Sequence, residues 1–61
     1  MMAIYRVIRV DCPICGRDFW AFSEREAVAR LAVHLIVRHG FETHRAYDTA
    51  RKVVSEVLGR V

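Results

Sequence analysis

The pattern of apolar and polar positions predicts a β-hairpin at the start of the chain. Residues 3–10 are rich in β-branched and aromatic side chains, which predicts a strand that ends at Asp11. Residues 18–22 have the same character and predict the returning strand. The segment between them contains Pro13 and Gly16, which favour a tight turn because proline fixes one backbone angle and glycine tolerates a positive one.

A helical pattern follows the hairpin. Ser23 and Glu26 have the Ser-x-x-Glu order of a capping box, so we expect a helix to begin after Ser23. Gly40 suits the left-handed position after the last turn, and Phe41 would then pack back on Ile36 as in a Schellman motif. Six apolar residues at helical spacing predict a core-facing stripe: Ala27, Val28, Leu31, Ala32, Leu35 and Ile36. Three more lie off that stripe, which predicts cover on more than one side: Ala29, Val33 and Val37.

The expected cover is a second helix over residues 44–58, with Thr43 as N-cap and Gly59 as terminator. Its apolar side chains are Ala46, Tyr47, Ala50, Val53, Val54, Val57, Leu58 and Val61. The opposite face carries Arg45, Asp48, Lys52, Ser55 and Glu56. The predicted fold class is α+β in the order β-β-α-α. Residues 1–61 form one domain, in which an amphipathic helix over residues 43–59 packs on residues 3–40.

The length of the chain makes a further source of stability necessary. At 61 residues it lies near the small end of what folds unaided. The candidates are Cys12 and Cys15, whose short separation favours a metal or redox role over a structural disulfide. The N-terminus lacks the pattern of an export signal, and residues 31–37, the longest apolar run, fall short of the about 20 residues that span a bilayer. We therefore expect a cytoplasmic protein with no membrane contact.

Four residues have the spacing of a zinc site. A Cys-x2-Cys turn, here Cys12 and Cys15, presents two thiolates to one side of a tetrahedral ion. Two helical imidazoles, His34 and His39, can complete the other side. Residues five apart lie about 140° out of phase on an ideal helix. Both imidazoles therefore reach one ion only if the last turn is distorted, and Gly40 favours such a distortion.

These residues resemble the C2H2 zinc finger family. The positions that are similar to the family's knuckle, core aromatic and helix are Cys12, Cys15, Phe19, Leu31, His34 and His39. The resemblance covers residues 10–40 and implies a zinc-stabilised ββα finger. Between Cys15 and His34 lie 18 residues, whereas the family usually has about 12. The capping signal at Ser23 predicts that the excess lengthens the helix at its N-terminal end.

The length of this insertion is similar to that of single, extended fingers in small proteins of archaea and their viruses. The chain contains no Asn and no Gln, which fits a protein from a hot environment, where amides are lost.

Other roles for these residues stay open. Cys12 and Cys15 would suit a redox pair, although a thioredoxin-like site needs a βαβ context that the pattern does not predict. His34 and His39 would also suit an ordinary helix, and His44 is a rival fourth ligand. Because zinc with four protein ligands has no open position for water or substrate, we expect no enzymatic activity and no small-molecule substrate.

The resemblance implies binding to double-stranded DNA and a role in transcriptional regulation. In DNA-binding fingers, helix residues at set offsets before the first zinc histidine read bases in the major groove. Here these offsets give Ala27, Ala29, Arg30 and Val33. Only Arg30, which Glu26 can pair at i,i+4 spacing, can make the bidentate contact to guanine. Arg25 is a candidate at the helix start, and Arg17 and Arg38 are candidates for phosphate contacts. The formal net charge of +3 is compatible with this function but carries little weight.

A second hypothesis is a protein-interaction finger or homodimerisation module. It depends on Ala29, Val33 and Val37, which would leave an apolar patch beside the second helix. A third and weaker hypothesis is a redox or metal-carrier module.

Overall fold

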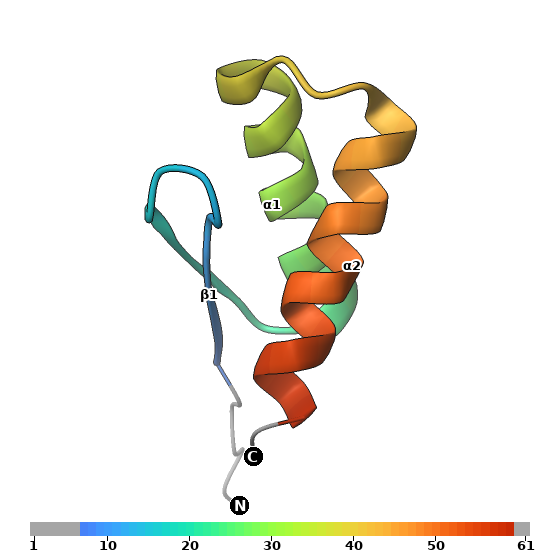
Figure 1. The fold of residues 1–61 in the computed structure, drawn as a ribbon. Coiled ribbons are helices and arrows are strands. Elements are labelled where there is room, and N and C mark those ends of the chain that lie inside the picture. Colours follow the sequence, from blue (N-terminus) through green and yellow to red (C-terminus); the bar gives the residue numbers. More distant parts are fainter. Residues whose placement is uncertain (1–6, 60–61) are drawn as a thin grey trace, which may run out of the picture.

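A computed structural model of the chain describes residues 7–59 and gives a small α+β fold (Figure 1). Strands β1 (Ile8–Asp11) and β2 (Asp18–Ala21) form a two-stranded antiparallel hairpin. Helices α1 (Glu24–His39) and α2 (Thr43–Gly59) follow. The helices lie side by side, and the hairpin runs along the pair with its turn toward the C-terminal end of α1 (Figure 1). The element order confirms the predicted fold class.

The hairpin has one buried face and one exposed face. The paired residues are Ile8 and Ala21, Arg9 and Trp20, Val10 and Phe19, and Asp11 and Asp18. Val10 and Ala21 are buried against the helices, whereas Arg9 and Trp20 face outward. This alternation is the period of two expected for a half-buried strand. On the exposed face, the guanidinium of Arg9 lies 3.7 Å from a carboxylate oxygen of Asp11 and 3.7 Å from one of Asp18.

The strands differ from the prediction at their ends. The start of the first predicted strand, residues 3–6, lies outside the described residues, and β1 continues to Asp11. Strand β2 ends at Ala21, one residue before the predicted end. The reason is that the backbone N–H of Phe22 donates to Oε1 of Glu26, at 2.7 Å, in the first turn of α1.

Helix α1 begins and ends as the sequence predicts. The hydroxyl of Ser23 accepts a hydrogen bond from the N–H of Glu26 at 3.1 Å, and Ser23 has extended backbone angles. The bond that Glu26 returns goes to the N–H of Phe22, not to that of Ser23 as in the usual capping box. At the other end, Gly40 is left-handed, with φ 67° and ψ 23°. The part of α1 before His34, residues 24–33, thus takes up more than half of the 18-residue interval between the second cysteine and the first histidine.

The core lies where the hairpin and both helices meet. Its buried apolar residues are Val10, Cys12, Ala21, Ala27, Leu31, Ala32, Leu35, Ala46, Ala50 and Val54. The predicted stripe of α1 faces this core, with Val28 and Ile36 at its margin. The prediction that α1 is covered on more than one side is confirmed, but the cover does not reach Val33, which is 51% exposed, or Val37, which is 72% exposed. The hairpin and α2 cover α1 from two sides and leave this third side open.

Helix α2 includes both residues that the sequence placed at its boundaries, Thr43 and Gly59. It turns Ala46, Ala50 and Val54 to the core. The last residue of its predicted apolar set, Val61, lies outside the described residues. Within residues 7–59, neither helix has the length and apolar character needed to cross a membrane.

Candidate metal centre

The structure brings four potential metal ligands together at one end of the molecule. Cys12 follows β1, Cys15 lies in the hairpin turn, and His34 and His39 lie on the last turns of α1. One ligand atom from each residue lies within 4.8 Å of the other three. These four residues can therefore hold a metal ion.

The hairpin turn positions the two cysteines through its backbone. The N–H of Cys12 donates to the carbonyl of Arg17 at 2.7 Å, and the N–H of Gly16 donates to the carbonyl of Cys12 at 2.9 Å. Gly16 has a φ of 79°, a conformation that side chains with a Cβ rarely adopt. The N–H of Ile14 points at Sγ of Cys12 from 3.4 Å. A backbone donor at this position stabilises a thiolate, which is the form that binds metal.

A widened last turn of α1 brings the two histidines to the same site. The N–H of Gly40 is directed at the carbonyls of both Ile36 and Leu35, and the N–H of Phe41 reaches the carbonyl of Leu35 at 3.1 Å. The bond from Gly40 to Ile36 spans four residues, as in a regular α-helix, whereas the bonds from Gly40 and Phe41 to Leu35 span five and six residues. The ring centroids of His34 and His39 consequently lie 5.0 Å apart. The predicted distortion is present, although its hydrogen bonds differ from those of a Schellman motif.

Two of the sulfur–nitrogen spacings match those around a tetrahedral zinc ion. Sγ of Cys15 lies 3.3 Å from Nε2 of His34, and Sγ of Cys12 lies 3.6 Å from Nε2 of His39. Zinc binds sulfur at about 2.3 Å and nitrogen at about 2.0–2.1 Å, which separates the two by about 3.5 Å in a tetrahedron. Two thiolates with two imidazoles are also a common donor set for structural zinc.

Burial keeps His34 in the state that binds metal. His34 is 8% exposed, and its ring meets the ring of Phe19 edge to face, with centroids 4.8 Å apart. Burial lowers the pKa of His34 below its usual value, and electrostatic interactions with His39, Arg17 and Arg38 lower it further. The imidazole is therefore neutral at pH 7, as coordination requires.

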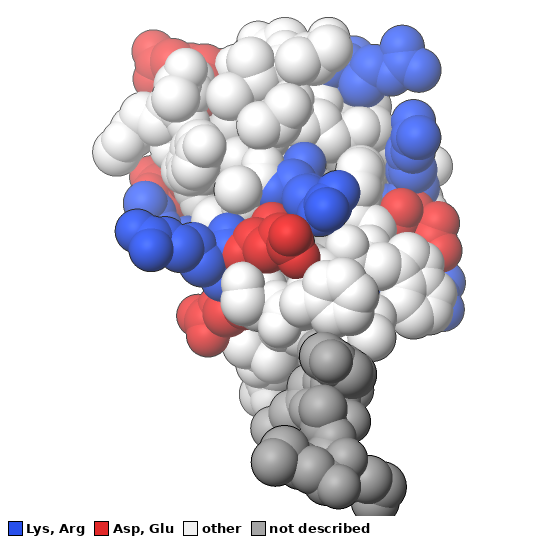
Figure 2. All heavy atoms as spheres, turned by 180° about the vertical axis from the view of Figure 1, so that it is seen from behind, with Lys and Arg blue, Asp and Glu red and all other residues white. Residues whose placement is uncertain are grey.

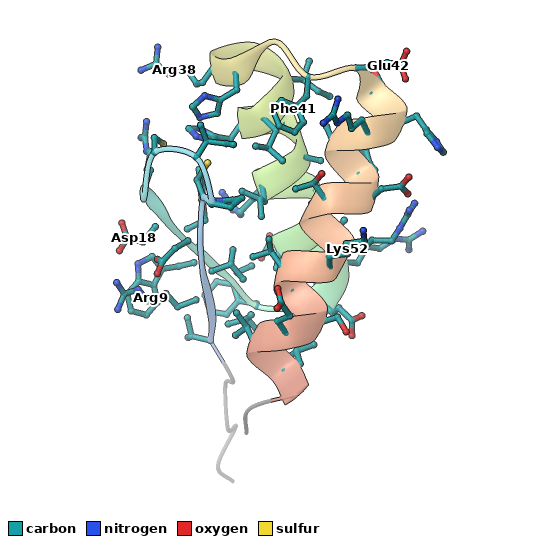
Figure 3. The ribbon with its side chains drawn as sticks, in the orientation of Figure 1. Arg9, Asp18, Arg38, Phe41, Glu42 and Lys52 are labelled. Carbon is teal, nitrogen blue, oxygen red and sulfur yellow. The ribbon has the colours of Figure 1, made fainter. Side chains whose placement is uncertain are left out.

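A basic hollow adjoins the metal centre. It has a volume of about 310 Å³ and is lined by Cys15, Arg17, His34, Arg38 and His39. Arg17 comes from the end of the hairpin turn, and Arg38 comes from the last turn of α1. In Figure 3, Arg38 lies above the hairpin turn. The sequence identifies both arginines as candidates for phosphate contacts. It cannot predict that they line the same hollow, because 21 positions separate them in the sequence.

The other two candidate arginines lie elsewhere on α1. Arg30 is exposed, with its guanidinium 3.5 Å from the carboxylate of Glu26, which confirms the predicted pair. Arg25 is also exposed. It stands five residues before Arg30, about 140° around an ideal helix, so the two do not share a face.

The rival ligand His44 is not part of the cluster. Its side chain is 81% exposed, and its Nε2 lies 3.2 Å from a carboxylate oxygen of Asp48 in the first turn of α2.

Comparison with protein-family models, with curated proteins and with solved structures finds no match to this chain. Arguments about function therefore depend on the site itself.

Proposed function

We propose that the chain is a C2H2-type zinc finger protein that holds one structural zinc ion and binds double-stranded DNA, with a role in transcriptional regulation. The observation that carries the proposal is the joint placement of a Cys2His2 cluster and a basic hollow at the C-terminal end of α1.

The donor set supports zinc. Two thiolates and two neutral imidazoles match its ligand preference, and their charges sum to zero with the ion. Bound zinc would join the hairpin turn, through Cys12 and Cys15, to the end of α1, through His34 and His39. With cobalt in place of zinc, we expect visible absorption typical of a tetrahedral site with two thiolates. Native mass spectrometry should find one metal ion per chain, and a metal-free protein would contradict the proposal.

Two uncompensated arginines support contact with DNA phosphates. Within residues 7–59, neither Arg17 nor Arg38 forms an ion pair, whereas Arg9, Arg30 and Arg51 each face a carboxylate. Arg17 instead lies over the ring of Phe19, with its guanidinium carbon 5.9 Å from the centroid. Paired arginines have their charge partly satisfied, so unpaired ones are the better candidates for an anionic partner, and Arg17 and Arg38 line the same hollow.

The metal ligands add donors to the same hollow. When Nε2 of a histidine binds a metal, the ring proton is on Nδ1, which can donate to an anion. His34 and His39 both line the hollow. Two guanidinium groups and two imidazole N–H groups are together a suitable environment for phosphate oxygens.

A salt titration with matched variants tests DNA binding. We would measure binding of the zinc-loaded protein to a labelled duplex of mixed sequence by fluorescence anisotropy, at salt concentrations between about 50 and 200 mM. The Arg17→Ala/Arg38→Ala variant should bind more weakly, with the slope of log affinity against log salt reduced by about two, one for each phosphate contact.

The control is Arg9→Ala/Arg51→Ala, which removes the same charge from two paired arginines. Its slope should stay at the wild-type value, because those charges face aspartates. Equal losses in both variants would mean that only net charge matters. Absence of duplex binding by the zinc-loaded protein at the lowest salt would refute the DNA-binding function.

A homodimerisation module is the second candidate, and the exposure of Val33 and Val37 favours it. Sedimentation equilibrium over a wide concentration range would test it. A monomer at every concentration would remove this candidate.

A further inference from the structure

The side of α1 that the hairpin and α2 leave open forms a continuous stripe. We call it the outer face of α1, and it consists of Ala29, Arg30, Val33 and Val37. Val33 lies four positions after Ala29, three after Arg30 and four before Val37, which places these residues on one side of a helix. Only Arg30 carries a hydrogen-bonding side chain.

Part of the outer face is concave. Phe19, Ala29, Arg30 and Val33 line a shallow hollow of about 350 Å³. Viewed from behind, the molecule shows uncharged surface with one blue and one red group together near its centre, and further blue and red groups lie at its left and right edges (Figure 2). An occupant of this hollow would meet aliphatic and aromatic carbon together with one guanidinium.

The apolar hollow and the basic hollow are linked by a contact between residues of their linings. Arg17 lines the basic one and stacks on Phe19, which lines the apolar one. On α1, exposed Val37 is followed directly by Arg38. A ligand that follows the helix from the outer face toward the metal centre would therefore pass from apolar contacts to free positive charge. Charge complementarity thus favours a polyanion with apolar groups over an uncharged protein surface.

The major groove of DNA offers this combination. Thymine is the base that presents a methyl group there, and apolar side chains recognise it by contact. Ala29 to Val37 spans about 12 Å along the helix, which corresponds to about three to four base pairs at about 3.4 Å each. Arg30 can address a guanine among them, since exposed ion pairs such as the one with Glu26 are weak.

We infer that the outer face of α1 recognises thymine methyl groups in the major groove, so that the preferred duplex is rich in thymine around a guanine. The inference depends on the proposed DNA binding, and it identifies the surface that determines which DNA sequence is preferred. Val33 and Val37 are the specificity-determining residues, and the arginines beside the metal centre hold the phosphates.

Replacement of thymine by uracil tests this inference, because it removes the methyl group and keeps the base pair. We would compare one thymine-rich duplex containing guanines with the same duplex carrying uracil at every thymine. Each lost methyl contact should weaken binding about fourfold, or on the order of tenfold for two contacts. In a duplex of guanine and cytosine alone, 5-methylcytosine in place of cytosine should strengthen binding.

Two variants complete the experiment. Val33→Ser/Val37→Ser should bind thymine and uracil duplexes equally and keep the wild-type salt dependence. Val7→Ser, a matched change at a residue of the hairpin that is 47% exposed, should retain the preference for thymine. Circular dichroism would confirm that both variants fold.

The possible results distinguish failure of thymine recognition from failure of DNA binding. Duplex binding that is indifferent to the methyl group overturns the inference and leaves the proposed function in place. No duplex binding at all refutes the proposed function as well. If the valine changes convert a dimer to a monomer and leave the methyl dependence unaltered, the outer face is a surface for self-association and the inference is wrong.

Discussion

The hairpin and the pair of helices are stabilised in different ways. Each strand has four residues, and the hairpin places only two side chains of its strands, Val10 and Ala21, fully in the core. A two-stranded hairpin of this size is at best marginally stable in water. The helices bury most of the remaining core residues against each other and against the hairpin: Ala27, Leu31, Ala32, Leu35, Ala46, Ala50 and Val54. The comparison teaches that a metal is most needed where apolar contacts are fewest, at the hairpin turn.

The helix pair is nevertheless a modest core. Its fully buried large side chains are Leu31, Leu35 and Val54, and the others are alanines. Alanine lets helices approach closely but removes little apolar surface from water, so its contribution to stability is small. The second helix therefore adds little apolar burial, and a metal bound at the four ligands would still stabilise the fold.

Removal of the metal should have the largest effect, because a bound ion would join the hairpin turn to the end of α1 through all four ligands. Structural zinc contributes about 10–16 kcal/mol of apparent binding free energy in small fingers. With a chelator in excess, we expect the amide protons of β1 and β2 to exchange as in an unfolded chain. The central turns of α1 and α2 should keep measurable protection, because the residues that they bury in the core are mostly apolar. Hydrogen exchange monitored by NMR would give this residue by residue.

The Cys12→Ser variant is the control, since it removes one ligand without a chelator. In this variant, the amide protons of the hairpin should likewise lose their protection from exchange, and those in the central turns of the helices should keep it. Uniform loss of protection in both regions would show that hairpin and helices form one cooperative unit, and the comparison would then fail.

A change in the helix pair should have an intermediate effect. Leu35 is fully buried, and Leu35→Ala should cost about 2–5 kcal/mol through lost burial and the cavity that it leaves. Thermal unfolding of the zinc-loaded protein would show a lower midpoint with the metal still bound. The matched variant on the same helix is Val37→Ala, which should change the unfolding free energy by at most about 0.5 kcal/mol because this side chain is exposed. Similar losses in the two variants would mean that the open side of α1 is covered.

Gly40 links the two regions, and its substitution should have a smaller effect that appears in metal binding. A side chain at its φ of 67° costs about 1–2 kcal/mol, although a Cβ there would meet no atom within 4 Å. Gly40→Ala should therefore weaken metal affinity by about tenfold, because the widened last turn that brings His34 and His39 together ends at this residue. Gly40→Asn should lose less, since asparagine tolerates the left-handed conformation. Competition with a metal-binding dye would measure both, and equal affinities for all three proteins would contradict this role.

Signals within a few residues of one another could be read from the sequence. The Ser-x-x-Glu order fixed the start of α1, and the glycine at position 40 marked its end. The spacing of cysteines and histidines identified the cluster because the chemistry of a metal limits which residues can meet. It also required a distorted last turn, which the structure contains.

Features that depend on tertiary geometry could not be read in this way. The common hollow of Arg17 and Arg38 exists because the hairpin turn meets the end of α1. The exposure of Val33 depends on where α2 crosses α1, and periodicity alone does not specify that side. The early end of β2 reflects one hydrogen bond, from the N–H of Phe22 to Glu26, that competes with strand pairing.

The smallest expected effect is at the histidine outside the metal centre. His44 is highly exposed and faces Asp48, which also accepts a hydrogen bond from Arg51 at 2.9 Å. His44→Ala should change the unfolding free energy by at most about 0.5 kcal/mol and leave metal affinity unaltered, because an exposed pair contributes little. His39→Ala, on the same titration, should weaken metal binding by orders of magnitude, since it removes one of four ligands. If the two variants lost affinity equally, His44 would act at the metal centre, and the start of α2 would have to move toward the hairpin when metal binds.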